Sequence, residues 1–486
     1  MSGPNAHPTP LLSIAKNAFS LTGGRMLLAL LRFVVALVIV QRAGIDRFGE
    51  FALILGFVFV AEWLSDFGLT DIAVRQVSAD PSRRTATLTA FALSKALQSL
   101  IAAATMGCAI ALLGYPQHMV RAGLIAAAAV IFYGGVQVYR VEFRLRMTME
   151  RDVAAELFCA VVLLASVWFV TRGPVSVEML ALCYAISRAV NLLAAGLLAG
   201  GWPHFKLGHN HSGELRLLAA AALPLGMTGL LVSVYDAMDA IALSQWSTNA
   251  EVGIFSVATR TVALAVVAEQ ALATAVFPVL AAQWVQDRGA FARTMQAILD
   301  WGTVFGAGLF CALHAGAHGL GALVKHDSGA IAEVLQLLSI ALLAKVIVTL
   351  VSPMVVIAGR LFFTVWISVL VVAAKLVGLM VLAPLGAMGA AAAYLIAEVG
   401  VGLIPTVILC QRAAGMQLRW SVPLRALAAA CAIAAACRWL GLEGTLVHGA
   451  LAFAAFMALA TALGAVRLQP LRQLFTAIAQ RRSGRA

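Results

Sequence analysis

The sequence predicts an all-α polytopic membrane protein with about 14 transmembrane helices, and three observations lead to this fold class. The 486 residues are 62% hydrophobic and 12% charged, with a mean hydropathy of +0.94. Soluble domains are about 45–50% apolar and about 25% charged, so soluble enzymes, fibrous proteins and disordered chains are excluded. The apolar residues form long runs joined by short turns, and the basic residues concentrate in alternate turns.

The apolar runs give the expected helices in chain order. Each is long enough to cross the hydrocarbon core as a helix of about 20 residues, and no turn is long enough to fold independently. Prolines inside several runs favour kinks, namely Pro224, Pro278, Pro353 and Pro405. The expected transmembrane segments are 17–41, 49–70, 86–113, 119–140, 152–171, 176–200, 216–244, 252–280, 295–324, 331–357, 361–383, 386–410, 422–441 and 445–466.

The basic residues indicate how these helices are oriented. With a cytoplasmic N-terminus, most Lys and Arg of the turns fall on the cytoplasmic side. The opposite side holds Arg42, Arg47, Arg121, Arg172, Lys325 and Arg438. The bias predicts cytoplasmic N- and C-termini and an even number of spans. We therefore interpret the net charge of +12 as a topology signal, and we expect no nucleic acid partner.

The cysteines and the N-terminal segment carry little chemistry. All seven cysteines lie in apolar stretches without a CxxC spacing, so we expect core residues and neither disulfides nor a metal site. The N-terminal segment has no short apolar run followed by a cleavage signal. A cleaved signal peptide is therefore not expected.

An internal repeat divides the chain into halves. A shift of 204 residues aligns residues 40–52 with residues 244–256, each of which is the turn after an odd-numbered span. The identical pairs are Gln41 with Gln245, Gly49 with Gly253 and Phe51 with Phe255. Six spans separate the copies, which predicts two parallel six-helix lobes. The expected domains are residues 1–205, residues 206–415, and residues 416–486 with two extra helices and a basic tail. A chance match of glycine–aromatic turns is the alternative.

Charged residues inside the spans are the candidate functional residues. A charge that faces lipid at mid-helix costs about 2.5–3.5 kcal/mol, so most must face the protein interior, a hydrated cavity or an interface. The cations are Arg25, Arg32, Lys95, Arg188, Arg260, Lys345 and Lys375, and the acids are Glu62, Asp66, Asp236, Asp239, Glu269 and Glu398.

Helical spacing places several of these charges on common faces. Arg25 and Arg32 are two turns apart on the first span, and Glu62 and Asp66 are one turn apart on the second. Arginine can grip phosphate oxygens in a fork geometry, which favours a polar cavity for an anionic ligand. The candidate cavity cations are Arg25, Arg32, Arg260, Lys95 and Lys345, and the candidate ion-coupling or gating acids are Asp66, Asp236, Asp239 and Glu269. Ion pairing between helices and snorkelling near helix ends are the alternative interpretations.

Other motifs favour no enzyme and no metal centre. His204, His209 and His211 cluster in a turn, and Cys311, His314 and His318 have helical spacing, but neither group has the carboxylate of a zinc site. No phosphate-binding Walker motif is present, and no outer loop is large enough for a catalytic pocket. A transporter without a resident cofactor is expected.

Two stretches resemble a known family of transporters. Residues 23–78 contain Gly24-Arg25, then Arg42, Gly44 and Phe48-Gly49, then Asp66-Phe67-Gly68-Leu69 and Arg75, and residues 235–260 place Asp239, Gly253, Phe255 and Arg260 at a matching turn. Together with VFPVL at 276–280, these motifs are similar to the polysaccharide transporter flippases of the multidrug/oligosaccharidyl-lipid/polysaccharide exporter superfamily. Arg32 departs from the family pattern, so its expected role depends on its location alone.

The resemblance implies a V-shaped, two-lobed transporter of the bacterial inner membrane that works by alternating access. Its implied cargo is an undecaprenyl-pyrophosphate-linked oligosaccharide for O-antigen, capsule or exopolysaccharide assembly, with polymerase and chain-length proteins as pathway partners. Either H⁺ or Na⁺ is open as a coupling ion. A peptidoglycan-precursor flippase, a multidrug cation antiporter, and a membrane polymerase or ligase remain alternatives.

Overall fold

The computed structural model describes residues 10–201, 212–324, 327–415 and 417–466, and the predicted His204, His209 and His211 cluster lies outside them. Helices joined by short turns make up these residues, and no strand occurs among them. The predicted all-α fold class is confirmed. The helices are α1 (Pro10–Ala43), α2 (Ile45–Asp66), α3 (Leu69–Ala79), α4 (Arg84–Leu112), α5 (Gln117–Leu145), α6 (Met149–Val170), α7 (Val177–Ala199), α8 (Ser212–Trp246), α9 (Asn249–Gln286), α10 (Arg288–Gly321), α11 (Ser328–Val351), α12 (Pro353–Ile357), α13 (Leu361–Leu382), α14 (Ala387–Ile396), α15 (Ile404–Ala414), α16 (Ser421–Trp439) and α17 (Leu446–Ala462).

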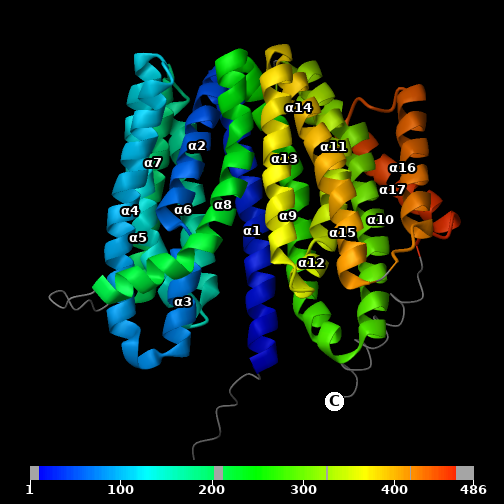
Figure 1. Cartoon of the computed structure of the whole chain (residues 1–486). Helices are drawn as coiled ribbons and strands as arrows, with labels where there is room; N and C mark the ends of the chain where they lie inside the picture. Colours follow the sequence, from blue (N-terminus) through cyan, green and yellow to red (C-terminus); the bar gives the residue numbers. More distant parts are fainter. Residues whose placement is uncertain (1–9, 202–211, 325–326, 416, 467–486) are drawn as a thin grey trace, which may run out of the picture. The chain divides into compact units, whose positions relative to one another are not determined.

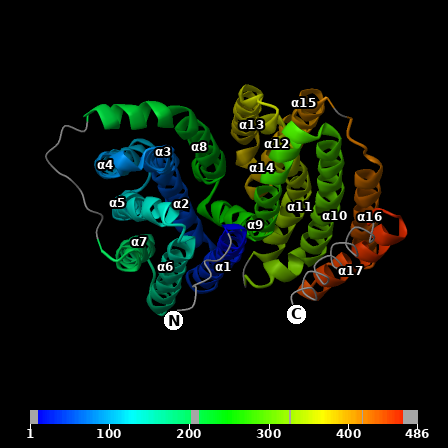
Figure 2. The ribbon, with the colours of Figure 1, turned by 90° about the horizontal axis from the view of Figure 1, so that it is seen from below.

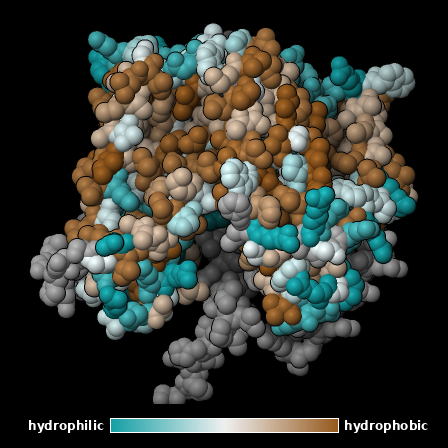
Figure 3. Space-filling view, in the orientation of Figure 1, coloured by the Kyte–Doolittle hydropathy of each residue, from teal (hydrophilic) through white to brown (hydrophobic). Residues whose placement is uncertain are grey.

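Thirteen helices in the described part of the chain are long and apolar enough to span a membrane. The fourteenth predicted span corresponds to α17, an apolar helix of 17 residues, which is near the lower limit of about 17 residues for a span. On the face shown in Figure 3, hydrophobic side chains cover the middle of the helices and hydrophilic side chains gather toward their ends. The protein is therefore a multi-pass membrane protein.

Three segments differ in detail from the predicted spans. The first helix begins at Pro10, so Gly24-Arg25 lies within α1 and does not open it. The expected turn after the second span contains α3, because apolar residues recur at helical spacing and pack against α4, α5 and α8. The twelfth span is divided into α14, the π-helical segment η3 (Ala397–Leu403) and α15.

Packing divides the chain into two compact units. Unit 1 comprises Met1–Ala268 and Ser368–Ala393, and unit 2 comprises Glu269–Ile367 and Tyr394–Ala486. Helices α9, α13 and α14 each contribute residues to both units. The domain boundaries expected from the repeat remain a prediction.

Within unit 1, α2 is the central helix. It packs against α1, α4, α5, α7 and α8 (Figures 1 and 2). The end of α2 and the residue after it meet glycines of α8: a Cβ on Gly229 would lie 2.4 Å from the Trp63 ring, and a Cβ on Gly226 would lie 2.3 Å from the ring of Phe67. Helix α8 contains Pro224 and is visibly bent in both views, as expected for an internal proline.

The two turns that the repeat aligns lie against each other in unit 1. A Cβ on Gly49 would lie 1.8 Å from the Asn249 carbonyl oxygen, and a Cβ on Gly253 would lie 2.5 Å from the Ile45 carbonyl oxygen. Both glycines lie in the first turns of their helices, α2 and α9. Reciprocal contact between equivalent positions is what a two-fold relation requires, which supports the repeat. It also explains the glycines, since no side chain fits between the backbones.

Within unit 2, α16 and α17 pack on α10 through small residues. Val304, Ala307 and Cys311 of α10 share an apolar cluster with Ala426 of α16 and Phe456 of α17. The α10 and α17 backbones also approach closely, with a Cβ on Gly316 only 3.5 Å from the Gly449 Cα. Small residues permit such close helix packing in membranes, where apolar association alone gives little.

Candidate functional site

The Asp-Phe-Gly-Leu motif ends α2 and places a buried ion pair. Phe67 and Gly68 both have left-handed backbone conformations, with φ of 42° and 75°, which stops the helix at Asp66. The Asp66 carboxylate contacts the ammonium of Lys95 from α4 and accepts a hydrogen bond from the Thr70 hydroxyl. Two of the predicted site residues, Asp66 and Lys95, are therefore brought together as partners.

Lys95 also completes the end of α2. Its ammonium donates to the carbonyl oxygens of Ser65 at 3.2 Å and Asp66 at 3.3 Å. An ammonium has three donors, and the Asp66 carboxylate and these two carbonyls occupy all of them. The side chain is 1% exposed. The pair therefore holds α2, α3 and α4 together.

A second network joins α2, α5, α6 and α7. Arg188 lies 2.7 Å from the Glu62 carboxylate, and it donates to the Tyr184 hydroxyl at 3.0 and 2.8 Å, while Tyr184 donates to Glu62 at 3.3 Å. Arg140 binds Asp152 at 2.9 Å and also pairs with Glu156. Two arginines thus meet three acids.

Sequence reasoning missed part of this network. Asp152 and Glu156 lie inside the predicted span 152–171 and Arg140 lies at the end of the predicted span 119–140, but none of the three is among the candidate residues. The available signal was the spacing of Asp152 and Glu156, which are one helical turn apart and therefore share a face of α6. Their common partner on α5 could not be inferred from spacing.

A third ion pair joins α8 to α13. The Lys375 ammonium lies 2.6 Å from the Asp239 carboxylate and donates to the Tyr235 carbonyl oxygen at 2.7 Å. It also lies 3.8 Å from the centroid of the Tyr235 ring and is 0% exposed. Asp236, the other predicted acid of α8, is exposed.

Three predicted cavity cations form no salt bridge with an acid among the described residues. Arg25 and Arg32 are exposed on α1, and Arg260 of α9 is half-buried with its guanidinium 5.1 Å from the Phe48 ring centroid. Arg32 and Arg260 lie close enough to repel each other, and both also lie within electrostatic range of Tyr184. The structure thus brings together two arginines from α1 and α9 that are 228 positions apart in sequence.

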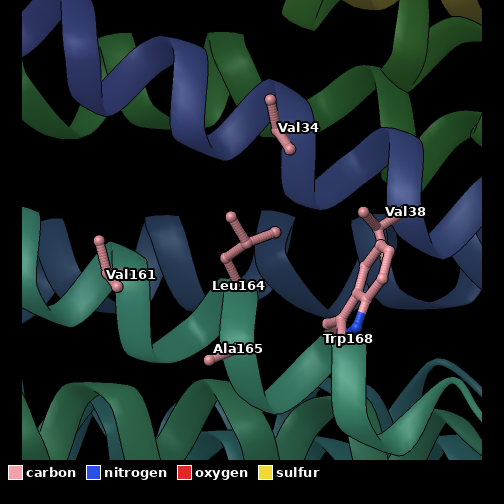
Figure 4. Close-up of a pocket in the computed structure, with 6 residues that line it drawn as sticks. All are labelled: Val34, Val38, Val161, Leu164, Ala165 and Trp168. Carbon is pink, nitrogen blue, oxygen red and sulfur yellow. The ribbon is translucent and has the colours of Figure 1, made fainter.

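An apolar groove lies beside Arg32 on the same helix. Val34 and Val38 of α1 face Leu164, Ala165 and Trp168 of α6 across it, with Val161 at one end (Figure 4). Its volume is about 340 Å³, and hydrocarbon lines it throughout. Arg42 stacks on Trp168 at 3.5 Å from the ring centroid. The groove therefore suits hydrocarbon and offers no polar group to a ligand.

The predicted charges of unit 2 form a smaller cluster. Lys345 of α11 donates to the Tyr394 hydroxyl at 3.1 Å. Glu269 of α9 is 0% exposed, and Lys345 and Glu398 lie within electrostatic range of it. Cys311, His314 and His318 lie elsewhere on α10, where His314 packs on Phe310 with ring centroids 5.1 Å apart. The described residues contain no group of three metal-ligating side chains.

Comparisons with known proteins agree with this architecture. A family model described as polysaccharide biosynthesis protein matches residues 14–284, more than half of the chain. No curated protein matches the chain. The structure of the lipid II flippase MurJ in an inward closed conformation is similar with a TM-score of 0.77 at 11% identity, covering 92% of this chain and 98% of that chain.

Two other solved transporters are also similar. An inward-facing multidrug resistance MATE family transporter of the MOP superfamily has a TM-score of 0.62 at 14% identity, covering 80% of this chain and 96% of that chain. A MOP superfamily transporter from Pyrococcus furiosus has a TM-score of 0.58 at 16% identity, covering 82% and 96%. At these identities the likeness shows the fold alone, which this chain shares with all three transporters.

Proposed function

The chain belongs to the polysaccharide biosynthesis protein family, and we propose that it flips an undecaprenyl-pyrophosphate-linked oligosaccharide across the bacterial inner membrane. The oligosaccharide would be a repeat unit for O-antigen, capsule or exopolysaccharide assembly. The head of this cargo is large, polar and anionic, so it cannot cross about 30 Å of hydrocarbon unaided.

The observation that carries this proposal is the contrast among the intramembrane cations of unit 1. Lys95, Arg188 and Lys375 are each neutralised by an acid. Arg32 and Arg260 form no ion pair with an acid among the described residues, and they lie near each other. Glu156 lies within electrostatic range of Arg32, but its ion pair is with Arg140. Charged side chains inside membrane segments carry a large desolvation cost and are commonly functional. Guanidinium groups bind phosphate oxygens bidentately. We therefore assign Arg32 and Arg260 to the pyrophosphate, with Arg25 as a further contact along α1.

The paired charges receive a different role. Lys95 and Asp66 form an ion pair with each other, and Asp239 forms one with Lys375. We therefore assign these residues to the stability of unit 1. Lys345 and Glu269 belong to unit 2 and are assigned to ion coupling below. Asp236 is exposed beside Asp239 on α8 and remains a candidate gating acid.

The topology and pathway of the proposal follow from the cargo. Cytoplasmic termini would put the start of α4 at Arg84, the end of α5 at Arg144 and the start of α6 at Arg151 on the side where the carrier lipid is loaded. Alternating access then exposes the arginines first to the cytoplasmic leaflet and afterwards to the outer leaflet. Polymerase and chain-length proteins are the proposed partners on the outer side.

The test is complementation of a deletion strain by the full chain. Loss of surface polysaccharide, build-up of lipid-linked repeat units on the cytoplasmic side, and recovery of both by the wild-type chain would support the proposal. Unchanged polysaccharide together with drug sensitivity would overturn it in favour of an antiporter. Arrest of peptidoglycan synthesis with intact polysaccharide would overturn it in favour of a precursor flippase.

A further inference from the structure

Glu269 of α9 differs from the other acids of the described residues. Both of its carboxylate oxygens are buried and lack a hydrogen-bond partner, which holds for no other acid in the ranges the structure describes. The hydroxyl of Thr349 lies beside the carboxyl without meeting hydrogen-bond geometry. An ionised carboxylate in such a place would lose its hydration without compensation, and adding a proton removes most of that cost.

The charged groups around Glu269 do not balance. Among the described residues, Lys345 of α11 and Glu398 of η3 are the charged side chains within electrostatic range of it. With all three ionised, two negative charges meet one positive charge and the cluster carries a net charge of −1. One proton on Glu269 makes the cluster neutral. Unit 1 shows the alternative, since Asp66 and Asp239 are neutralised there by lysines.

The cluster lies beside an irregular helix. Glu398 belongs to the π-helical segment η3, which packs against α11 and precedes Pro405 at the start of α15. Short π-helical segments are rare, and they are frequently found at functional sites. Their i→i+5 hydrogen bonds interrupt the regular i→i+4 pattern of the α-helix. Repulsion between Glu269 and Glu398 therefore acts on a segment whose helical register is already changed, and protonation removes this repulsion.

We propose that Glu269 is a proton-binding site of unit 2, which takes up one proton from water and releases it during the conformational cycle. In this step an O–H bond of hydronium breaks and an O–H bond forms on the carboxyl, whose charge changes from −1 to 0, and water is released. Lys345 and Glu398 set the charge around the proton, and η3 is the segment that responds. The proposal goes beyond the assigned cargo and does not depend on it.

The test is infrared difference spectroscopy of the purified full-length protein, titrated from acidic to alkaline buffer. The wild-type protein is expected to show the carbonyl stretch of a protonated carboxylic acid that persists to neutral pH. Glu269→Gln, which imitates the protonated form, should lack this band. Glu333→Gln removes an exposed acid of α11 and should retain it.

Two further measurements keep the outcome decisive. Glu269→Asp should retain a carboxylic acid band at a shifted position, which excludes misfolding as the cause of its loss in Glu269→Gln. Addition of sodium chloride at constant pH should leave the band in place. An unchanged band in Glu269→Gln would overturn the proposal, and so would a wild-type band that sodium abolishes. Because no cargo is needed, failure of complementation would leave this result intact.

Discussion

Two buried acids, each beside a lysine, show how differently this protein treats charge in its two units. In unit 1, the Asp66 carboxylate forms an ion pair with Lys95, and the ammonium also donates hydrogen bonds to two backbone carbonyl oxygens at the end of α2. In unit 2, Lys345 donates to Tyr394, and the carboxylate oxygens of Glu269 stay without a hydrogen bond among the described residues. The types of residue are nearly the same, but the contacts are not.

The difference indicates which charges are structural. A buried pair that satisfies its own hydrogen bonds fixes the helices that carry it, and removing one partner exposes the other to a large desolvation cost. An acid without a partner contributes no such contact and is free to change its protonation. The same criterion separates the paired cations of unit 1 from Arg32 and Arg260.

The largest expected effect compares amide substitutions of the two acids. Asp66→Asn leaves Lys95 buried without a counter-charge and should destabilise the protein by about 3–5 kcal/mol. Glu269→Gln breaks no contact and should cost at most about 1 kcal/mol. Thermal unfolding in detergent, followed by tryptophan fluorescence, measures both. The double variant Asp66→Asn with Lys95→Met should recover much of the loss, and equal shifts for the two single variants would refute the comparison.

The next effect concerns the unpaired arginines. Arg32→Ala or Arg260→Ala should each remove charge-assisted hydrogen bonds to the pyrophosphate, worth about 1.5–3 kcal/mol or about 10- to 150-fold in binding. Surface polysaccharide and membrane abundance of the variant measure transport and insertion separately. Arg121→Ala, which removes an exposed arginine of α5, serves as the control. Full restoration of surface polysaccharide by both Arg32→Ala and Arg260→Ala would contradict the assignment of these arginines to the cargo site.

A smaller effect tests the contact between the repeated turns. Gly49→Ala would place a Cβ 1.8 Å from the Asn249 carbonyl oxygen, so α2 and α9 must separate. We expect a loss of about 1–3 kcal/mol, the usual cost of overpacking. Gly56→Ala on the same helix has its nearest neighbour at 3.8 Å and should be tolerated. Equal thermal stability of the two variants would argue against close packing at Gly49.

The smallest effect concerns an exposed acid at the start of α10. The Asp287 carboxylate accepts hydrogen bonds from the backbone N–H groups of Ala290 and Gly289, which hold the pKa of Asp287 below its ordinary value. Its contribution to stability is present above the ordinary aspartate pKa and is lost as the pH falls through the lowered native value.

The measurement for Asp287 is the unfolding midpoint as a function of pH. Asp287→Ala should lower the midpoint slightly at neutral pH, and the difference from the wild-type protein should vanish in acid. Asp287→Asn keeps a capping side chain without a titrating group and should show a weaker pH dependence. A difference between Asp287→Ala and wild type that is constant with pH would contradict the cap.

The sequence alone determined the fold class, the approximate spans and the family. These follow from composition and from the 3.6-residue period of the apolar residues, which are local properties of the sequence. A membrane constrains them strongly, because a segment that spans it must form all its backbone hydrogen bonds internally. The repeated glycines at 49 and 253 are also visible in the sequence, although only the structure shows that a Cβ at either position would clash with a backbone carbonyl of the other turn.

The tertiary structure alone decided which charges are partners. Helical spacing placed Glu62 and Asp66 on one face of α2, but their cations come from α7 and α4. Lys375 reaches Asp239 across 136 residues of sequence. Pairing depends on which helices become neighbours and how they rotate, and no period within one helix contains that information. The candidate charges are therefore visible in the sequence, and packing decides which of them form ion pairs that hold the helices together and which form none.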